Sequence, residues 1–372
     1  MITGGGNIKL AQSEWFIVID VQLFDGYRVI PHGALEVRDG HIHRLYEQTP
    51  DRIDKRTQVV DGNGQTILPA MLNAHTHVQK SDQLKEALQH GIFVLLDLHS
   101  PAETAEQLRP YRDSLEYAYL LTSGPAATVS GGHGTQFFRP PVIGGELSAR
   151  QFVLDRVAER ADFIKIVREP LLNTLSFEQI DTLIQTAHDH EKLVITHISI
   201  QEDAKKVVEL GTDGLAHVWL DQHASEPDLE ELKSHRAFVI PTLLVISQLL
   251  TINENQHRGF LSVDELKNEV KRLFEAGVPL LAGTDAPNLN LNYGDDLFEE
   301  LALLSAAGLP NLIVLQSATS LIADTFGLAD YGRLQTGQEA NFVLVEGDPL
   351  SSIGDLNHQK SIYRKGKRIN AP

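Results

Sequence analysis

The sequence predicts an α/β fold, a (β/α)8 TIM barrel combined with a small β-sandwich-like domain that both chain ends form. In the middle of the chain, short runs rich in Ile, Leu, Val and Ala alternate with helix-like stretches such as EDAKKVVELG and VDELKNEVKRLFEAG. This alternation is typical of a parallel sheet whose strands are connected by helices. At both ends, short apolar runs are instead separated by polar turns, which is typical of hairpins.

The two ends of the chain are expected to pair with each other. Residues 14–66 read as short strands whose turns carry Asp-Gly or Asn-Gly pairs, and the tail after Gly327 continues in the same style with GRLQTGQEANFVLVEG and SIYRKGKRI. Neither end has enough strands for a core of its own. We therefore expect residues 1–66 and 327–372 to form one composite β-domain, with the barrel, residues 67–326, inserted between them.

Eight strands are expected in the barrel, and helix-like stretches follow most of them. Ser262 and Gly277 are suited to begin and end one of these helices. The C-terminal ends of barrel strands meet at one mouth, where the active site lies. The aperiodic segment 125–147 is rich in Gly and Pro and follows the third strand, so it should lie over this mouth. The expected strands are 67–78, 92–99, 116–124, 162–167, 193–198, 214–219, 237–244 and 279–286.

The composition excludes some classes of binding partner and some types of metal ligand. The 372 residues include 50 acidic and 32 basic side chains, a formal charge of −18. Such a charge repels nucleic acid and anionic lipid, so we expect a small-molecule substrate and neither of those partners; a homo-oligomer stays open. The chain has no Cys, so a metal must use His, carboxylate or modified Lys. The N-terminus lacks the pattern of a secretory signal and no apolar run could span a membrane, so a cytoplasmic protein is expected.

Four histidines lie at the ends of apolar runs. His75 and His77 close the run ILPAMLNAHTH, and alternate residues of a strand face the same side, so both imidazoles can point at one ion. His197 in LVITHIS and His217 in GLAHVW end later strands. Neutral imidazole is a common zinc ligand. Solvated or hydrogen-bonded histidines are the alternative for each one alone, but their shared place at one mouth favours a metal site. The remaining histidines are expected mostly at the surface.

Lys165 and Asp285 also end apolar runs, DFIKIV and PLLAGTDA. A charged lysine is rarely buried without a partner, and desolvation lowers its pKa, leaving a neutral amine that can add carbon dioxide. The resulting carbamate has two oxygens and could bridge two metal ions; an internal salt bridge is the alternative. Asp285 could bind an ion and exchange a proton with metal-bound water, or it could simply form a turn or a helix N-cap.

Three further residues are candidates for substrate contact. His133 in the loop SGGHG could bind a tetrahedral oxyanion or a substrate carboxylate, unless it is an ordinary loop histidine. Arg139 could bind a carboxylate bidentately. Tyr293, after the last expected strand, could donate a hydrogen bond to substrate.

Taken together, these motifs resemble the amidohydrolase superfamily in its binuclear form with a carboxylated lysine. ILPAMLNAHTHV is similar to the superfamily pattern LPG-[LM]-[IV]-[DN]-[AGP]-H-x-H, with Ala70 in place of Gly. The tail GRLQTGQEANFVLVEGDPL resembles the closing hairpin of that superfamily, with Asn341 in place of Asp. ADFIKIV and SGGHG resemble the branch of Xaa-Pro dipeptidases, carboxypeptidase-like enzymes and ochratoxinase. GLAHVW departs from the IEH that is frequent in this branch, which weakens a peptide as the substrate.

The resemblance implies a function and a set of ligands. The implied activity is metal-dependent hydrolysis of a C–N amide bond in a dipeptide, an N-acyl amino acid or a cyclic amide, by attack of a metal-bridging hydroxide. Two divalent ions are implied, zinc first, with manganese, iron or cobalt as alternatives. A mononuclear deaminase or imidazolonepropionase-like hydrolase is the nearest alternative, although Lys165 would then lack a role. A noncatalytic binding scaffold is the alternative of another class. By resemblance, the more buried ion is held by His75, His77 and Asp285, the more exposed ion by His197 and His217, and both by N6-carboxylated Lys165.

Overall fold

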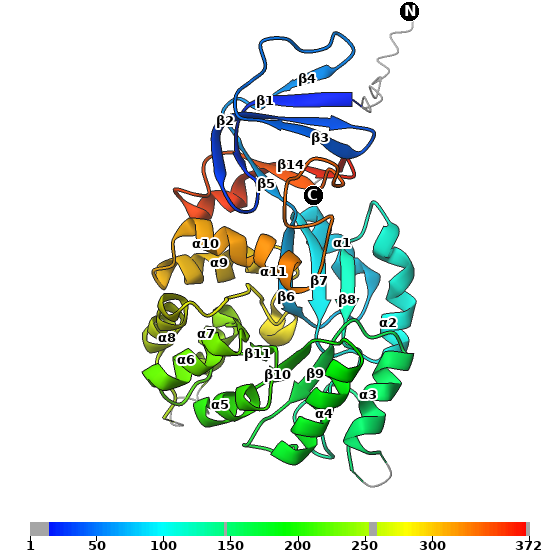
Figure 1. Cartoon of the computed structure of the whole chain (residues 1–372), viewed down its shortest axis with the longest axis vertical. Coiled ribbons are helices and arrows are strands. Elements are labelled where there is room, and N and C mark those ends of the chain that lie inside the picture. The colour runs from blue at the N-terminus through cyan, green and yellow to red at the C-terminus, as the bar shows by residue number, and fades with distance from the viewer. Residues whose placement is uncertain (1–14, 145–146, 253–258, 370–372) are drawn as a thin grey trace, which may run out of the picture.

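The computed structural model describes residues 15–144, 147–252 and 259–369. Strands from both ends of the chain share one eight-stranded sheet, at the top of Figure 1. β5 joins the two ends, because it pairs with β1 on one side and antiparallel with β13 on the other, where Leu68 lies opposite Val343. The limits of the composite domain stay a prediction. The sheet order is β15-β14-β13-β5-β1-β2-β3, with β4 beside β1, and the strands are β1 (Trp15–Phe24), β2 (Val29–Arg38), β3 (His41–Tyr46), β4 (Gln58–Asp61), β5 (Thr66–Pro69), β13 (Phe342–Val345), β14 (Gln359–Arg364) and β15 (Lys367–Ile369).

Two parallel sheets carry the middle of the chain. Single parallel bridges connect Ala127 to Ile166 of the second sheet, Val239 of that sheet to Leu280, and Thr76 of the first sheet to Ala286. This is a TIM-barrel-like α/β arrangement, but the predicted closed ring of eight strands is not shown. The first sheet contains β6 (Met71–Thr76), β7 (Ile92–Asp97) and β8 (Tyr119–Thr122), and the second contains β9 (Ile164–Val167), β10 (Val194–His197), β11 (Gly214–Ala216) and β12 (Phe238–Ile240).

The prediction of a regular eighth strand over 279–286 was wrong. Pro279 has no N–H to donate to a ladder, and Asp285 has a φ of +67°, far from extended backbone. The segment nevertheless lies between the two sheets, since Leu281 donates its N–H to Val239 and Ala282 accepts from Ala74, both at 2.9 Å. It therefore still brings Asp285 to the carboxyl end of β6.

Helices flank the two parallel sheets (Figure 1). The predicted ends of α8 are confirmed, because the Ser262 hydroxyl accepts the N–H of Glu265 and Gly277 follows the helix with a φ of +85°. No helix within the described ranges is both long and apolar enough to cross a membrane. The helices are α1 (Ser81–Gln89), α2 (Ala102–Leu108), α3 (Ala149–Ala158), α4 (Phe177–Asp189), α5 (Gln201–Glu209), α6 (Glu226–Ser234), α7 (Leu243–Thr251), α8 (Val263–Ala276), α9 (Asp296–Ala306), α10 (Asn311–Ser317) and α11 (Ser320–Thr325).

Candidate metal-dependent active site

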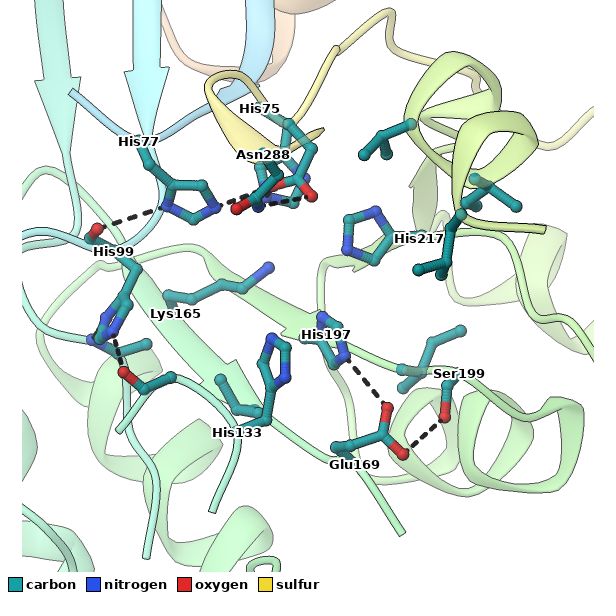
Figure 2. Close-up of a pocket in the computed structure, with 18 of the residues that line it drawn as sticks. His75, His77, His99, His133, Lys165, Glu169, His197, Ser199, His217 and Asn288 are labelled. Atoms are coloured by element: carbon teal, nitrogen blue, oxygen red, sulfur yellow. Dashed lines mark hydrogen bonds and ion pairs between the residues drawn. The ribbon is translucent and has the colours of Figure 1, made fainter. Parts of the chain in front are cut away.

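One cavity of about 310 Å³ lies at the carboxyl ends of the parallel strands (Figure 2). Its wall collects polar side chains from β6, β9 and β10, from the residue after β11, and from the segment that bridges to β6. Residues that are far apart in the sequence therefore share one small volume, as parallel strand topology predicts. All six expected metal ligands, together with His133, line this cavity: His75, His77, Lys165, His197, His217 and Asp285.

Asp285 is the centre of the first ligand group. Its Oδ1 lies 3.1 Å from Nε2 of His75 and 2.8 Å from Nε2 of His77, while Oδ2 accepts a 2.9 Å hydrogen bond from Asn288. Burial opposes ionisation of Asp285, but the adjacent imidazoles hold its pKa well below the usual range. Burial lowers the pKa of His75 to about 3, so this imidazole is neutral at physiological pH. An ionised carboxylate against imidazole nitrogens is a donor set suited to a divalent cation.

His217 is held in one tautomer by Thr242. The Thr242 hydroxyl lies 2.5 Å from Nδ1 of His217 and donates its own proton to the carbonyl of Pro241 at 2.8 Å. It must therefore accept from Nδ1–H, which leaves Nε2 of His217 unprotonated. The ligand atoms of His217, His75 and Asp285 all lie within 4.8 Å of one another. This trio combines residues expected at each of the two ions, so the two expected sites form one continuous volume.

His197 lies against a carboxylate that the sequence analysis missed. Its Nε2 is 3.6 Å from Oε2 of Glu169, which follows β9 by two residues (Figure 2). Burial opposes ionisation of Glu169, but His197 and the N–H of Leu171 keep its pKa below the usual value. A carboxylate beside one ring nitrogen orients a histidine and leaves its other nitrogen, here Nδ1, for a cation. Glu169 is thus placed to position His197.

Lys165 lies deep in the cavity. Its side chain is buried, and Nζ has no hydrogen-bond partner among the described residues. Burial lowers the pKa of this amine to about 7. The described residues also form no ion pair with it, so the internal salt bridge considered as the alternative is not formed there. A buried lysine without a partner is costly and is commonly retained for chemistry.

The three candidates for substrate contact lie in different places. The ring of His133 stacks on His197 with 4.7 Å between centroids, and burial, with His197 nearby, lowers the pKa of His133 to about 3. Arg139 is exposed and is not among the residues that line the cavity. Tyr293 is buried beneath the site, where its hydroxyl donates a 2.6 Å hydrogen bond to the carbonyl of His77. The structure therefore places His133 at the cavity, but neither Arg139 nor Tyr293, because one points to solvent and the other uses its proton on the backbone.

His99 corrects the expectation that the remaining histidines lie mostly at the surface. It is only 8% exposed and lines the cavity. Nδ1 accepts from the N–H of Ala126 at 2.9 Å, and Nε2 lies 3.2 Å from the carbonyl of Gly134. His99 thereby fixes the loop that carries His133 over the mouth, where segment 125–147 was expected. The signal was present in the sequence, because His99 ends the predicted strand 92–99.

Much of the rest of the cavity wall is apolar. Helix α7 contributes three of these apolar side chains, Val245, Ile246 and Leu249. The start of this helix is held by buried Glu300, whose carboxylate accepts the N–H groups of Leu243 and Leu244 at 3.0 and 2.7 Å. This carboxylate satisfies two of the four N–H groups that a helix N-terminus leaves without partners. The apolar side chains at the cavity include Phe137, Val167, Ile198, Val218, Leu220, Val245, Ile246, Leu249 and Leu289.

Comparisons with known proteins show what the whole chain is similar to. The chain is 24% identical to the 5-methylthioadenosine/S-adenosylhomocysteine deaminase of Bacillus cytotoxicus over 87% of the chain and 81% of that relative. A Xaa-Pro dipeptidase structure with bound methionine superposes with a TM-score of 0.82 at 17% identity, covering 96% of this chain and 100% of that one. An ochratoxinase of A. niger gives 0.78 at 20% identity, with 97% of each chain covered. At such low identity, the likeness to these solved structures shows the fold alone.

The family follows from a separate match that covers most of the chain. Residues 66–369 match the amidohydrolase family, which is most of the chain and includes every residue of the candidate site. The match begins at β5 and ends at β15, so it also covers part of the composite sheet. The chain belongs to the amidohydrolase family.

Proposed function

We propose that this protein hydrolyses a C–N amide bond of a small molecule with the help of two divalent metal ions, preferentially zinc. Membership of the amidohydrolase family makes the chain a hydrolase that acts on C–N bonds. The observation that supports the binuclear form is the set of expected ligands in the cavity: four imidazoles, one carboxylate and a buried lysine whose Nζ has no hydrogen-bond partner among the described residues. A dipeptide, an N-acyl amino acid or a cyclic amide fits this chemistry.

The donor set divides between two ions and a bridge. Lys165, as an N6-carboxylated side chain, would hold both ions. Its lowered pKa supports this role, because the neutral amine is the form that adds carbon dioxide, and so does the lack of a partner in the part of the chain that the structure describes. When bound, such ions supply Lewis acidity toward the scissile carbonyl and lower the pKa of water. His75, His77 and Asp285 would hold one ion, and His197 and His217 the other.

Two side chains supply proton chemistry and charge stabilisation. Asp285 is ionised and therefore ready to accept the proton of the attacking water and to return it to the leaving amine. His133 is neutral and carries one N–H, which suits it to donate to the oxyanion of a tetrahedral intermediate. Both lie on the wall of the same cavity.

A mononuclear deaminase is the second candidate. The curated relative from Bacillus cytotoxicus carries a deaminase name, and deamination also breaks a C–N bond. The buried Lys165 opposes this alternative, because a single ion leaves the amine without a role. A noncatalytic scaffold is opposed by the complete donor set, which binding alone would not require.

Metal content and substrate class test the proposal together. Protein reconstituted with zinc is analysed for elements and screened with dipeptides, N-acyl amino acids, lactones and cyclic imides, with S-adenosylhomocysteine as the probe for deamination. About two ions per chain and hydrolysis of an amide are expected. One ion per chain with ammonia release from S-adenosylhomocysteine would establish the deaminase instead. Two ions without turnover of any probe would contradict the proposed amide hydrolysis.

A further inference from the structure

Glu169 is a carboxylate in the cavity wall that forms no ion pair with a lysine or arginine among the described residues. Its side chain is 12% exposed and lines the cavity beside Ser199 (Figure 2). We propose that Glu169 is a specificity determinant that selects substrates with a protonated amine over substrates with a carboxylate. This inference rests on the proposed function and narrows its substrate class.

The hydrogen-bond partners of Glu169 are uncharged. Oε1 accepts from the hydroxyl of Ser199 at 3.1 Å and from the N–H of Leu171 at 3.0 Å. Oε2 contacts Nε2 of His197 at 3.6 Å, and a carboxylate oxygen can accept from two donors, so Oε2 keeps acceptor capacity for one more. A partly desolvated carboxylate with an open acceptor favours a cationic donor from the substrate.

The neighbouring arginine does not compensate this charge. Arg168 donates to Asp203 at 2.9 Å and to the carbonyl of Leu175 at 2.7 Å, and its guanidinium lies 4.4 Å from the ring centroid of Phe177. These contacts hold it outside the cavity, whose lining does not include it. Its charge is therefore committed to Asp203.

Outside the proposed metal site, the described cavity wall carries no guanidinium for a substrate carboxylate. No arginine is among the described residues that line it, and Lys165 is the only lysine. That lysine lies within the ligand group and is committed to the metal site by the proposed function. A carboxylate on the substrate would therefore meet Glu169 without a guanidinium to bind it, and like charges in a desolvated site repel.

The apolar wall completes the description of the substrate. Val245, Ile246 and Leu249 of α7, with Leu289, offer an apolar surface in the same cavity as Glu169. The favoured substrate is thus an amide that carries an apolar group and a protonated amine. An N-acyl amino acid with a free carboxylate fits less well.

Three β-naphthylamides with the same scissile bond test this selection. Leucine β-naphthylamide carries a protonated amine, its N-acetyl derivative is neutral, and its N-succinyl derivative carries a carboxylate. Metal-loaded wild type should show the highest kcat/KM with the free amine and the lowest with the succinyl compound. In Glu169→Gln, the amine-to-succinyl ratio should fall by about 10- to 100-fold, the scale of one hydrogen bond to a charged group. The ratio is the readout because any effect through His197 lowers all three rates together.

Two control variants separate charge in the cavity from charge elsewhere. Glu202→Gln removes the same charge from an exposed residue that does not line the cavity, so it should leave the ratio unchanged. Glu169→Asp keeps the charge and should retain most of the preference for the amine. An equal fall of all three rates in Glu169→Gln, with the ratio unchanged, would overturn the inference and leave Glu169 only the positioning of His197.

A binding measurement distinguishes failure of this inference from failure of the proposed reaction. Calorimetry measures the affinities of isoamylamine and isocaproate for the metal-loaded wild type and for Glu169→Gln. If the naphthylamides are not hydrolysed but the amine-to-carboxylate affinity ratio falls by about tenfold or more in the variant, the selection by Glu169 stands without the proposed reaction. An unchanged affinity ratio, or no binding of isoamylamine to the wild type, would overturn the selection itself.

Discussion

Thr242→Val should weaken metal binding although Thr242 is not a ligand. The hydroxyl of Thr242 accepts Nδ1–H of His217 at 2.5 Å and donates to the carbonyl of Pro241 at 2.8 Å. Valine keeps the size and the branched Cβ but removes both hydrogen bonds. The buried Nδ1–H then lacks an acceptor, which costs about 1–3 kcal/mol. The ring can relieve this cost by rotating or by moving its proton to Nε2, and either change removes the lone pair that faces Asp285 and His75.

The expected loss of zinc affinity is about 10- to 100-fold, the usual effect of removing the partner of a metal-binding histidine. Competition with a chromophoric chelator measures this affinity, and thermal unfolding of the metal-free proteins measures the structural cost separately. Thr196→Val is the matched control, because Thr196 is also fully buried and its hydroxyl pairs with Thr212 at 2.8 Å instead of with an expected ligand. Thr196→Val should lower stability but keep zinc affinity. Equal zinc affinity in wild type and Thr242→Val would refute the argument that this hydroxyl sets the tautomer of His217.

Four further variants test the roles of individual side chains. Lys165→Ala should lose activity while remaining folded, and added acetate or propionate should restore part of it; an unfolded variant with unchanged metal content would make the lysine structural. Asp285→Asn should retain much of the metal but lose roughly 10²–10⁴-fold in kcat, the range for general acid–base catalysis, and a loss of only a few-fold would exclude a proton-transfer role. His133→Ala should lower kcat by about 10²-fold without changing metal content, and unchanged kinetics would return His133 to an ordinary loop residue. Burial raises the pKa of Glu300 from 4.5 to about 7. Between these pH values the folded state therefore binds one more proton than the unfolded state, and the free energy of unfolding must fall as pH rises. Compared with Glu300→Gln, the wild type should therefore lose up to roughly 3 kcal/mol between about pH 4.5 and 7 in urea unfolding, and parallel pH profiles would contradict this.

The convergence of the proposed metal ligands could be predicted because the fold topology brings them together. His75, His197 and Asp285 each end an apolar run. The first two lie on parallel strands, whose carboxyl ends meet at one mouth, and the irregular segment that carries Asp285 lies beside β6. The same rule applied to His99, which ends the run IFVLLDLH and does line the cavity. Reading it as a surface residue was therefore an avoidable error.

Other features depend on loop paths that periodicity does not encode. Glu169 reaches the cavity only because the chain turns after β9 and its carboxylate accepts the N–H of Leu171. Thr242 fixes the tautomer of His217 through its hydroxyl, which lies 2.5 Å from Nδ1 of His217. The two residues are far apart in the sequence, and their spacing does not predict this contact. The irregular backbone around Asp285 follows from the close approach to β6, where a Cβ on Gly283 would lie 2.8 Å from the backbone nitrogen of His75.

The placement of β5 between β1 and β13 has a consequence for biosynthesis. A ribosome makes β1 to β5 early, but the strand that covers the outer edge of β5 emerges only after the whole catalytic segment has been made. Until then, β5 presents unpaired N–H and C=O groups on which a foreign strand could align. Completion of this sheet therefore requires contacts between residues that are very distant in the sequence, and such contacts form slowly. A nascent chain that stops before β13 would keep this edge open and be prone to aggregation, so full-length release from the ribosome protects the molecule.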